Sequence, residues 1–468
     1  MRPNTMKHLQ SSAQGALVGL AVGDALGTTL EFSQRDSRPA LLDMIGGGPF
    51  KLAPGQWTDD TSMALCLADS LLNCHRHDPI DQLERYVRWW RQGENSVTGH
   101  CFDIGMTVSR ALQCYMDQHE PYPGLQSEHS AGNGSLMRLA PIAIFYSSYH
   151  SLRDEKAALS NLVEMARRSS MTTHRHPLAV SACQVMSLFI DHAMAALAPD
   201  ENEQPSQHSK RSVLTLSDLE LSLLGTLPAE IAAIVAGSYR NKRRDEIRSS
   251  GYVVHSLEAA LWAFWHSQSF AQGALLAANL GDDADTVAAI YGQLAGAYYG
   301  IDAIPAEWLK KLAWSERLIG LAATLSDRNL HRVPQDDELL VLLETMQRSA
   351  QDDTTHQGSL FLELVYECGV MQPDGMTAPI ARQVFGNGVS CSEALLAESL
   401  LWGREECCCL LGALARASRF NSFCGSDGIA VDIESGVIPV ILLRLATLLG
   451  TTFHHPYLPT DVVEIPAP

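Results

Sequence analysis

Two short stretches of this 468-residue sequence crowd carboxylates at the start of apolar, helix-like runs. The first is Thr58-Asp59-Asp60-Thr61 and the second is Gly281-Asp282-Asp283-Ala284-Asp285-Thr286. Either stretch alone fits helix capping, because Asp and Thr are favoured N-caps and carboxylates complement the helix dipole. Capping needs one side chain for each helix, however, and like charges held close together need a cation to offset their repulsion.

Both stretches offer oxygen ligands only, without His or Cys among them. Such ligands select hard cations, so Mg²⁺ or Mn²⁺ fits this chemistry better than zinc. If the two stretches converge in the folded chain, they can hold two ions a few ångströms apart. The predicted metal ligands are Thr58, Asp59, Asp60, Asp283, Asp285 and Thr286.

Helices are expected to position these carboxylates, because helical periodicity dominates the sequence and strand-like alternation is short and rare. We therefore predict an all-α fold, a compact multi-helix core with a smaller helical C-terminal domain. The polar, proline-containing stretch 199–211 predicts a surface loop. The predicted helices of the core span residues 14–27, 61–73, 81–91, 105–116, 154–168, 179–196, 257–265, 271–279 and 286–300.

Glycine recurs every four residues in two of these helices. On a helix this spacing lines one face with hydrogen atoms, so that another backbone can approach closely. Each interior glycine destabilises a helix by about 0.5–1 kcal/mol relative to alanine, which close packing must offset. The two stripes adjoin the acidic stretches, and they consist of Gly15, Gly19, Gly23 and Gly27, and of Gly292, Gly296 and Gly300.

The composition of the sequence changes around residues 325–335, where a polar segment ends in Pro334. We place a domain boundary there, with a catalytic domain over residues 1–330 and a helical C-terminal domain over residues 331–468. The second domain is either a stabilising appendage or an added surface for recognising a partner. Its predicted helices span residues 338–346, 360–368, 392–416 and 437–449.

Composition limits the partners of the chain. Lys and Arg number 34 against 53 Asp and Glu, a formal net charge of −19, which disfavours broad nucleic-acid binding. No uninterrupted apolar run of 18 residues predicts a membrane span, and the polar N-terminus lacks the apolar segment of a secretory signal. We expect a cytoplasmic protein whose 11 cysteines stay reduced.

The motifs of the chain occur in an order that resembles the ADP-ribosylglycohydrolases, the family of the nitrogenase reductase-reactivating enzyme and of the mammalian ADP-ribosyl-acceptor hydrolases. The resemblance covers roughly residues 14 to 320. It rests on the stretch from Gly15 to Gly27 with Glu31, Trp57-Thr58-Asp59-Asp60-Thr61, Phe102-Asp103-Ile104-Gly105, Gly132-Asn133-Gly134-Ser135-Leu136-Met137-Arg138, Thr173-His174, and Asp283-Ala284-Asp285-Thr286 with the glycine-striped helix to Gly300.

The resemblance implies two Mg²⁺ ions held by the six predicted ligands, with Mn²⁺ as an alternative. The ions would bind the hydroxyls of the distal ribose and a water near its anomeric carbon, and so supply a nucleophile at neutral pH. Catalytic roles would fall on Asp59, Asp60 and Asp283 at the metals. Glu31 matches an acidic residue that closes over the metals, and Asp103 matches one beside the departing group that can handle a proton.

The segment Gly132-Asn133-Gly134-Ser135 matches the loop that binds the diphosphate in this family. Its glycines let backbone amides turn toward anionic oxygens, although the same tetrapeptide read alone predicts a simple turn. His174 matches a histidine that contacts ADP-ribose, whereas a lone histidine is more often a cap or a surface residue. Asp282 and Ala284 depart from the usual family pattern without replacing a predicted ligand.

The implied activity is hydrolysis of mono-ADP-ribose from a modified protein, with arginine as the favoured acceptor and serine or a nucleobase still open. An alternative is an immunity protein that occludes an ADP-ribosyltransferase toxin, with or without hydrolase activity. The intact set of metal ligands favours the enzyme, because a protein that only plugs a toxin does not need them. A metal-dependent phosphohydrolase would explain neither the glycine stripes nor the order of the motifs.

Overall fold

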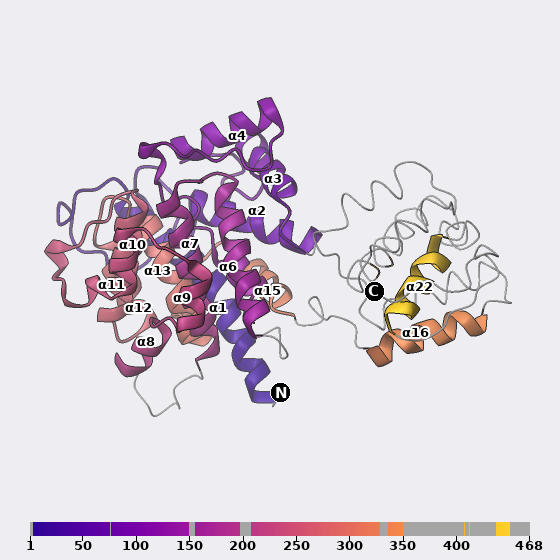
Figure 1. The fold of residues 1–468 in the computed structure, drawn as a ribbon. Coiled ribbons are helices and arrows are strands. Elements are labelled where there is room, and N and C mark those ends of the chain that lie inside the picture. The colour runs from indigo at the N-terminus through magenta and orange to yellow at the C-terminus, as the bar shows by residue number, and fades with distance from the viewer. Residues whose placement is uncertain are drawn as a thin grey trace. The chain divides into compact units, whose positions relative to one another are not determined.

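The structure, a computed structural model, describes residues 3–74, 76–148, 155–196, 207–327, 336–349, 407, 411 and 437–449. The chain divides into two compact units, Met1–Asp327 and Arg328–Pro468. Within the described ranges the regular elements are helices, and β-type pairing is limited to isolated bridges (Figure 1). The predicted all-α fold is therefore confirmed.

The first unit consists of a long run of helices joined by loops and 3₁₀ turns. Its helices are α1 (Pro3–Gly27), α2 (Asp59–Cys74), α3 (Pro79–Gln92), α4 (Met106–Gln118), α5 (Ala140–Phe145), α6 (Glu155–Met171), α7 (Pro177–Ala195), α8 (Gln207–Val213), α9 (Asp218–Leu224), α10 (Ala229–Val235), α11 (Val253–His266), α12 (Phe270–Ala278), α13 (Ala284–Tyr299), α14 (Ala306–Lys311) and α15 (Ser315–Leu325). Its 3₁₀ helices are η1 (Thr28–Leu30), η2 (Glu128–Ser130), η4 (Ser238–Asn241), η5 (Arg244–Glu246) and η6 (Ile301–Ala303).

Each predicted helix of this unit coincides with an observed one, although α1 begins well before residue 14. Local signals explain several boundaries. The Asp78 side chain accepts hydrogen bonds from the amides of Ile80 and Asp81 at the start of α3, and Gly93 ends that helix in the left-handed conformation. The loop predicted over residues 199–211 is wrong at its end, because α8 begins at Gln207.

Helices α1 and α13 form the centre of the first unit and pack along their lengths. Helix α13 is buried from Ala284 through Tyr298, as expected of a helix that is apolar on every side. The two glycine stripes face each other. A methyl group on Gly23 would overlap the carbonyl oxygen of Ala288, and one on Gly296 would overlap that of Gly15. Backbone therefore meets backbone without intervening side chains.

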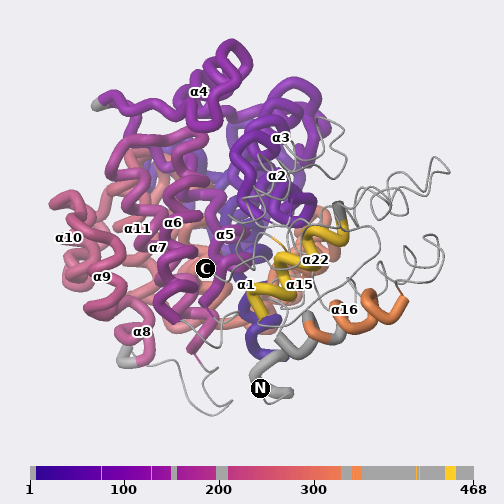
Figure 2. The backbone as a smooth tube through the Cα atoms, turned by 45° about the vertical axis from the view of Figure 1, so that its right-hand side comes forward, coloured from indigo at the N-terminus to yellow at the C-terminus, as the bar shows by residue number. Residues whose placement is uncertain are grey.

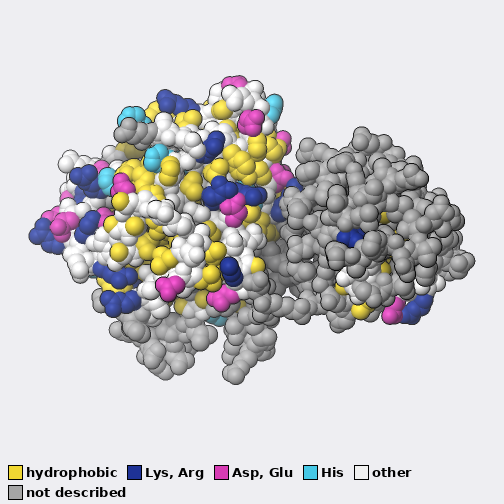
Figure 3. All heavy atoms as spheres, viewed as in Figure 1, with side chains coloured by type: hydrophobic (Ala, Val, Ile, Leu, Met, Phe, Trp, Pro, Cys, Tyr) yellow, Lys and Arg dark blue, Asp and Glu magenta, His cyan; other side chains and the backbone are white. Residues whose placement is uncertain are grey.

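The other helices surround this pair. Helices α7, α11 and α12 pack against α13, and α15 packs against α1. Figure 2 shows α5 next to α6 and α7, which it contacts. Helix α7 is long and apolar enough to cross a membrane, but most of it is buried inside the unit, as in the core helix of a globular protein. On the face drawn in Figure 3, acidic and basic side chains are scattered among apolar ones.

Two helices of the second unit are described, α16 (Asp336–Arg348) and α22 (Val437–Leu448), and they contact each other. Both coincide with predicted helices. The helix predicted over residues 360–368 lies outside the described residues. So does the one over 392–416, apart from Cys407 and Leu411, which are helical and buried. A role of residues 331–468 in partner recognition stays a prediction.

The contact between α1 and α13 predicts that alanine is not tolerated at Gly23. The added methyl group meets main-chain atoms that cannot rotate away, so Gly23→Ala should lower the free energy of unfolding by about 3 kcal/mol or more. Urea denaturation measures this loss. The matched control is Gly320→Ala in α15, where a methyl group meets open space and should stabilise the helix by up to about 1 kcal/mol. Equal stability of the two variants would contradict the packing argument.

Candidate metal centre

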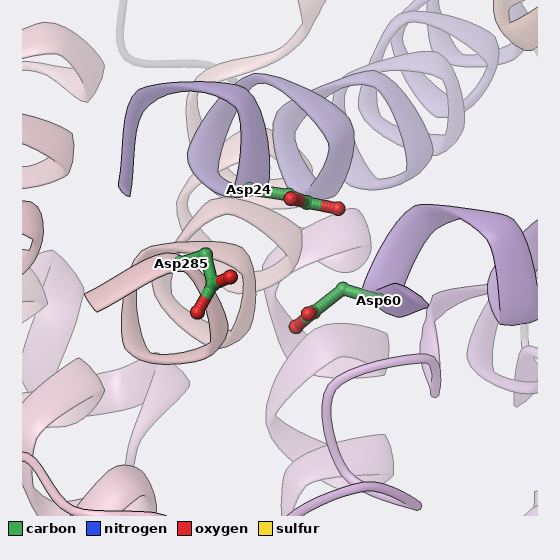
Figure 4. Close-up of side chains that lie close together, drawn as sticks. All are labelled: Asp24, Asp60 and Asp285. Atoms are coloured by element: carbon green, nitrogen blue, oxygen red, sulfur yellow. The ribbon is translucent and has the colours of Figure 1, made fainter. Parts of the chain in front are cut away.

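The ends of three helices bring the acidic stretches together. Asp60 lies in the first turn of α2, Asp285 lies in the first turn of α13, and Asp24 lies near the end of α1 (Figure 4). The Thr58 hydroxyl is 3.2 Å from Oδ2 of Asp60 and 3.2 Å from Oδ2 of Asp285, a residue 227 positions away in sequence. The Thr286 hydroxyl is 3.4 Å from Oδ2 of Asp60. The two predicted stretches therefore line one site.

Two groups of carboxylates in this site are close enough to share cations. Asp24, Asp60 and Asp285 form one group. Each of the three offers one carboxylate oxygen, and these oxygens lie within 4.8 Å of one another, as they also do in the second group. Glu31, Asp283 and Asp285 form the second group. Because Asp285 belongs to both, the two groups are adjacent and share one carboxylate, and each could hold a cation. Oxygen donors in this number suit Mg²⁺ or Mn²⁺.

Asp24 is a site residue that the sequence analysis missed. Its fully buried carboxylate accepts hydrogen bonds from the amide and hydroxyl of Thr58 and from the amide and hydroxyl of Thr61. These four bonds join α1 to the start of α2. A single charged residue within the apolar, glycine-striped segment 15–27 was the available signal.

Burial and mutual repulsion disfavour the charged form of these carboxylates. Burial and then the charge of Asp285 raise the pKa of Asp24 to about 7, against the hydrogen bonds from Thr61 and Thr58. The same two causes raise the pKa of Asp283 to about 7. Burial also raises the pKa of Asp59, aided first by Asp103, and the pKa of Asp60, aided first by Asp24. A divalent cation would offset this repulsion.

One oxygen of Asp60 tests whether the site fits a cation. Oδ1 of Asp60 is buried and has no hydrogen-bond partner among the described residues. A buried carboxylate oxygen without a partner is unfavourable, because it has lost its hydration without compensation. A metal ion would supply the missing interaction, so the residues present fit the predicted metal centre.

Glu31 lies at the end of α13 that faces the cluster. Its buried carboxylate accepts hydrogen bonds from the amide of Ala284, at 2.8 Å, and from the amide of Asp285, at 3.4 Å. It thereby caps α13, whose positive dipole end favours an anion. Burial, and next the charge of Asp285, nevertheless raise the pKa of Glu31 strongly. Glu31 is thus placed as a potential cation ligand, and its closing over the metals stays a prediction.

Asp103 stands at the edge of this cluster. It is half-buried, and its φ of 58° is in the left-handed region, which strains a residue other than glycine. Burial, followed by the charges of Asp285, Asp24 and Asp283, raises the pKa of Asp103 to about 8. At neutral pH its carboxyl group therefore carries a proton in the cation-free protein, which is suited to the predicted proton transfer.

The loop Gly132–Ser135 lies beside the carboxylates. The Asn133 side-chain amide donates to Oδ2 of Asp283 and to the Ser256 hydroxyl, and the Asn133 backbone amide donates to the carbonyl oxygen of Gly251. No acceptor for the backbone amides of Gly134 and Ser135 is found among the described residues. The loop can therefore offer amides to an anion while Asn133 fixes it to the acidic centre.

The buried His174 ring packs against the glycines of this loop, and the Ser135 side chain, which belongs to the loop, is also buried. Nδ1 of His174 lies 2.8 Å from the Thr173 hydroxyl, and a methyl group on Gly134 would come within 2.9 Å of the imidazole. Burial, and next the charge of Arg138, lower the pKa of His174 to about 3, so the ring is neutral. The Ser135 hydroxyl is buried and accepts a hydrogen bond from Ser170. Direct contact of either side chain with ADP-ribose stays a prediction.

Arg138 is a buried cation below the same loop. Its side chain is fully buried, with the guanidinium over the ring of Tyr86. It donates to the carbonyl oxygen of Gly134 at 2.9 Å and to the hydroxyl of Thr173 at 2.8 Å. Nε of Arg138 has no hydrogen-bond partner among the described residues. This charge places positive potential under the predicted diphosphate loop.

An all-helical scaffold thus carries two adjacent carboxylate groups that could hold metal ions, beside a glycine-containing loop. The sequence matches the family model of the ADP-ribosylglycohydrolases over residues 5–337. It is 47% identical over 331 residues to the ADP-ribosylarginine hydrolase Tri1 of Pseudomonas putida (strain GB-1), covering 71% of this chain and 81% of that one.

Two further relatives agree. The ADP-ribosyl-[dinitrogen reductase] glycohydrolase of Rhodospirillum rubrum is 31% identical over 312 residues, covering 64% of this chain and 90% of that one. A solved ADP-ribosylglycohydrolase-related protein complex superimposes with a TM-score of 0.56 at 39% identity, covering 68% of this chain and 98% of the solved chain. The chain belongs to the ADP-ribosylglycohydrolase family and is a glycosidic-bond hydrolase, as its motifs predicted.

The raised pKa values predict how Mg²⁺ binding depends on pH. Asp24 and Asp283, whose pKa values are raised to about 7, are protonated below neutrality, so they must release protons to bind a cation. In chelator, their stabilising contribution falls as pH rises through these values, because the charged forms repel. The Mg²⁺-induced increase in melting temperature should therefore be small at pH 6 and larger at pH 8.5.

Differential scanning fluorimetry with Mg²⁺ and with chelator measures this effect. Asp60→Asn should abolish the Mg²⁺-induced shift at both pH values. The matched control is Asp191→Asn, because Asp191 is a buried carboxylate outside the centre that accepts hydrogen bonds from Ser147 and Ser148. This control should destabilise the protein and keep the Mg²⁺ response. A response independent of pH would argue against the carboxylates as ligands.

Proposed function

We propose that this hydrolase removes ADP-ribose from a modified arginine of a protein and so reverses mono-ADP-ribosylation, with two Mg²⁺ ions at its acidic centre. The observation that carries the proposal is the convergence of Asp24, Asp60 and Asp285 with Glu31 and Asp283 beside an amide-offering loop. The arginine acceptor is supported by the relative named an ADP-ribosylarginine hydrolase.

The acidic centre suits cleavage at the anomeric carbon. Breaking a glycosidic bond builds oxocarbenium-like positive charge on the ribose, and a wall of carboxylates stabilises that charge. Divalent cations held there would supply Lewis acidity and so would make a water nucleophile available at neutral pH. The residues that would hold them are Asp24, Asp60, Asp285, Glu31 and Asp283, with the hydroxyls of Thr58 and Thr286 beside them. Asp59 is in neither group of ligands, but its charge interacts with those of Asp285, Asp24 and Asp283.

The remaining groups orient the substrate and move the proton. The amides of Gly134 and Ser135 would bind the diphosphate, with the buried Arg138 guanidinium adding positive potential below. Through its bond to Asp283, Asn133 holds that loop beside the carboxylates at which the ribose would react. Asp103, whose burial favours the protonated carboxyl group, would donate a proton to the departing guanidino nitrogen.

In a cytoplasmic setting, such an enzyme would protect the cell from an ADP-ribosyltransferase toxin by undoing the modification. A second candidate function is occlusion of the toxin by binding, with or without hydrolysis. The acidic net charge of −19 is suited to a basic partner. Hydrolysis is favoured, because the crowded carboxylates are destabilising without a cation and a binding protein would gain nothing from them.

The proposal predicts loss of activity when the α2 carboxylates are removed. The Asp59→Ala/Asp60→Ala variant should release ADP-ribose from an arginine-modified protein at least about 100-fold more slowly than the parent, because two groups at the metals are lost. Chelator should abolish release by the parent enzyme. Release of labelled ADP-ribose over time, with Mg²⁺ and with chelator, measures both effects.

The alternative makes the opposite prediction in the same assay. If the chain acts only by occlusion, neither arginine-linked nor serine-linked ADP-ribose is released under any condition. It should then inhibit a transferase at stoichiometric concentration, equally well with chelator and with the double substitution.

A separate substitution tests the proton donor. Asp103→Asn removes the titrating group, so kcat should fall by about 10²- to 10⁴-fold while the Mg²⁺-induced stabilisation is kept. The matched control is Asp282→Asn. Asp282 carries an exposed carboxylate, directly precedes Asp283 and has a φ of 55°, which asparagine also tolerates. Its kcat should stay within about twofold of the parent. A small effect of Asp103→Asn on kcat would remove Asp103 from the mechanism.

A further inference from the structure

Three phenylalanine rings contact one another outside the buried core. The ring centroids of Phe32 and Phe50 are 6.2 Å apart, and those of Phe50 and Phe102 are 5.2 Å apart. Phe32 is 68% exposed, and Phe50 and Phe102 are half-buried. None of the three is a member of the buried core of the first unit. We call Phe32, Phe50 and Phe102 the aromatic cluster.

The aromatic cluster adjoins two carboxylates of the site. Phe32 directly follows Glu31 in the chain, and Phe102 directly precedes Asp103. The charge of Asp103 contributes to the raised pKa values of both Glu31 and Asp59, so these carboxylates are close in space. The rings therefore lie where the segments carrying Glu31 and Asp103 meet, and the Phe32 ring is exposed to solvent.

The backbone holds this arrangement at a cost. Phe32 has a φ of 56° and Asp103 a φ of 58°, both in the left-handed region that disfavours residues with a side chain. The amide of Phe32 donates to the carbonyl oxygen of Asp282 at 2.8 Å, and the amide of Asp282 donates to that of Ser33 at 2.8 Å. Neither the strain nor the exposure of the Phe32 ring contributes to folding, and both are typical of a ligand-binding surface.

From this geometry we infer that the aromatic cluster is the acceptor subsite, which holds the planar guanidinium of the ADP-ribosylated arginine and the peptide beside it. This inference rests on the proposed function. A guanidinium stacks on an aromatic face through cation–π attraction, and arginine does so more readily than lysine. Glu31 and Asp103 are the chain neighbours of Phe32 and Phe102, so their carboxyl oxygens lie beside the rings as hydrogen-bond acceptors for a guanidinium. A serine acceptor has no cation to stack, so the cluster selects arginine.

The test separates stacking from apolar contact. Phe32→Leu and Phe102→Leu keep an apolar side chain on the same backbone but remove the aromatic ring. Phe32→Tyr keeps the aromatic ring. With an ADP-ribosylated arginine peptide, each leucine variant should raise KM by about 3- to 30-fold, with kcat within about twofold. The Phe32→Tyr variant should have the same KM as the parent enzyme. Binding of free ADP-ribose, measured by calorimetry, should not change in any variant.

The matched control is Leu221→Ala, which removes another exposed apolar side chain from α9, a helix that packs against α6 and α7. It should leave KM unchanged. An unchanged KM in the leucine variants of an active enzyme would overturn the acceptor subsite alone, whereas no release by the parent would overturn the proposed function too. A change of sedimentation in the leucine variants would assign the cluster to self-association and also overturn the inference.

Discussion

The close approach of α1 and α13 is the constraint on which the site depends. Because Gly15, Gly19 and Gly23 have no side chain, the α1 backbone lies directly against that of α13. This contact sets the position of Asp24 relative to Asp285, one on each helix. Alanines in place of these glycines would hold the two helices further apart. The carboxylates of Asp24 and Asp285 would then be too far from each other to share a cation. The glycines that cost helix stability are therefore the means by which two distant parts of the chain build one ligand set.

A second constraint opposes the first, because the same packing buries mutually repelling carboxylates. The protein offsets part of this repulsion locally. The amides of Thr58 and Thr61 donate to Asp24, and those of Ala284 and Asp285 donate to Glu31 at the start of α13. These bonds do not compensate burial, since the pKa values stay raised. The remaining unfavourable free energy is what a divalent cation can relieve, so cation affinity and fold stability are two consequences of one arrangement.

The sequence allowed prediction of the helical fold and the long helices, and it indicated a metal site on condition that the two acidic stretches converge, as they do in the structure. These follow from periodicity and from a density of like charge that capping does not explain. Asp24 was not predicted, because a single aspartate within an apolar helix carries no pattern of its own, and its meaning comes from the threonines that reach it from α2. Short helices such as α5 and α9 were also missed, since one or two turns give too little periodicity.

Tertiary contacts also determine the surroundings of the predicted diphosphate loop, which the sequence of the loop alone could not indicate. Gly132–Ser135 read alone is a turn, and its surroundings are what make it suited to the predicted binding of an anion. His174 fills the space below the glycines, Arg138 adds a buried charge, and Asn133 fastens the loop to Asp283. A substrate bound there would have its diphosphate and its reacting ribose held by groups that share one hydrogen bond. The hydrogen bond from Asn133 to Asp283 is therefore a direct link between the loop and the acidic centre.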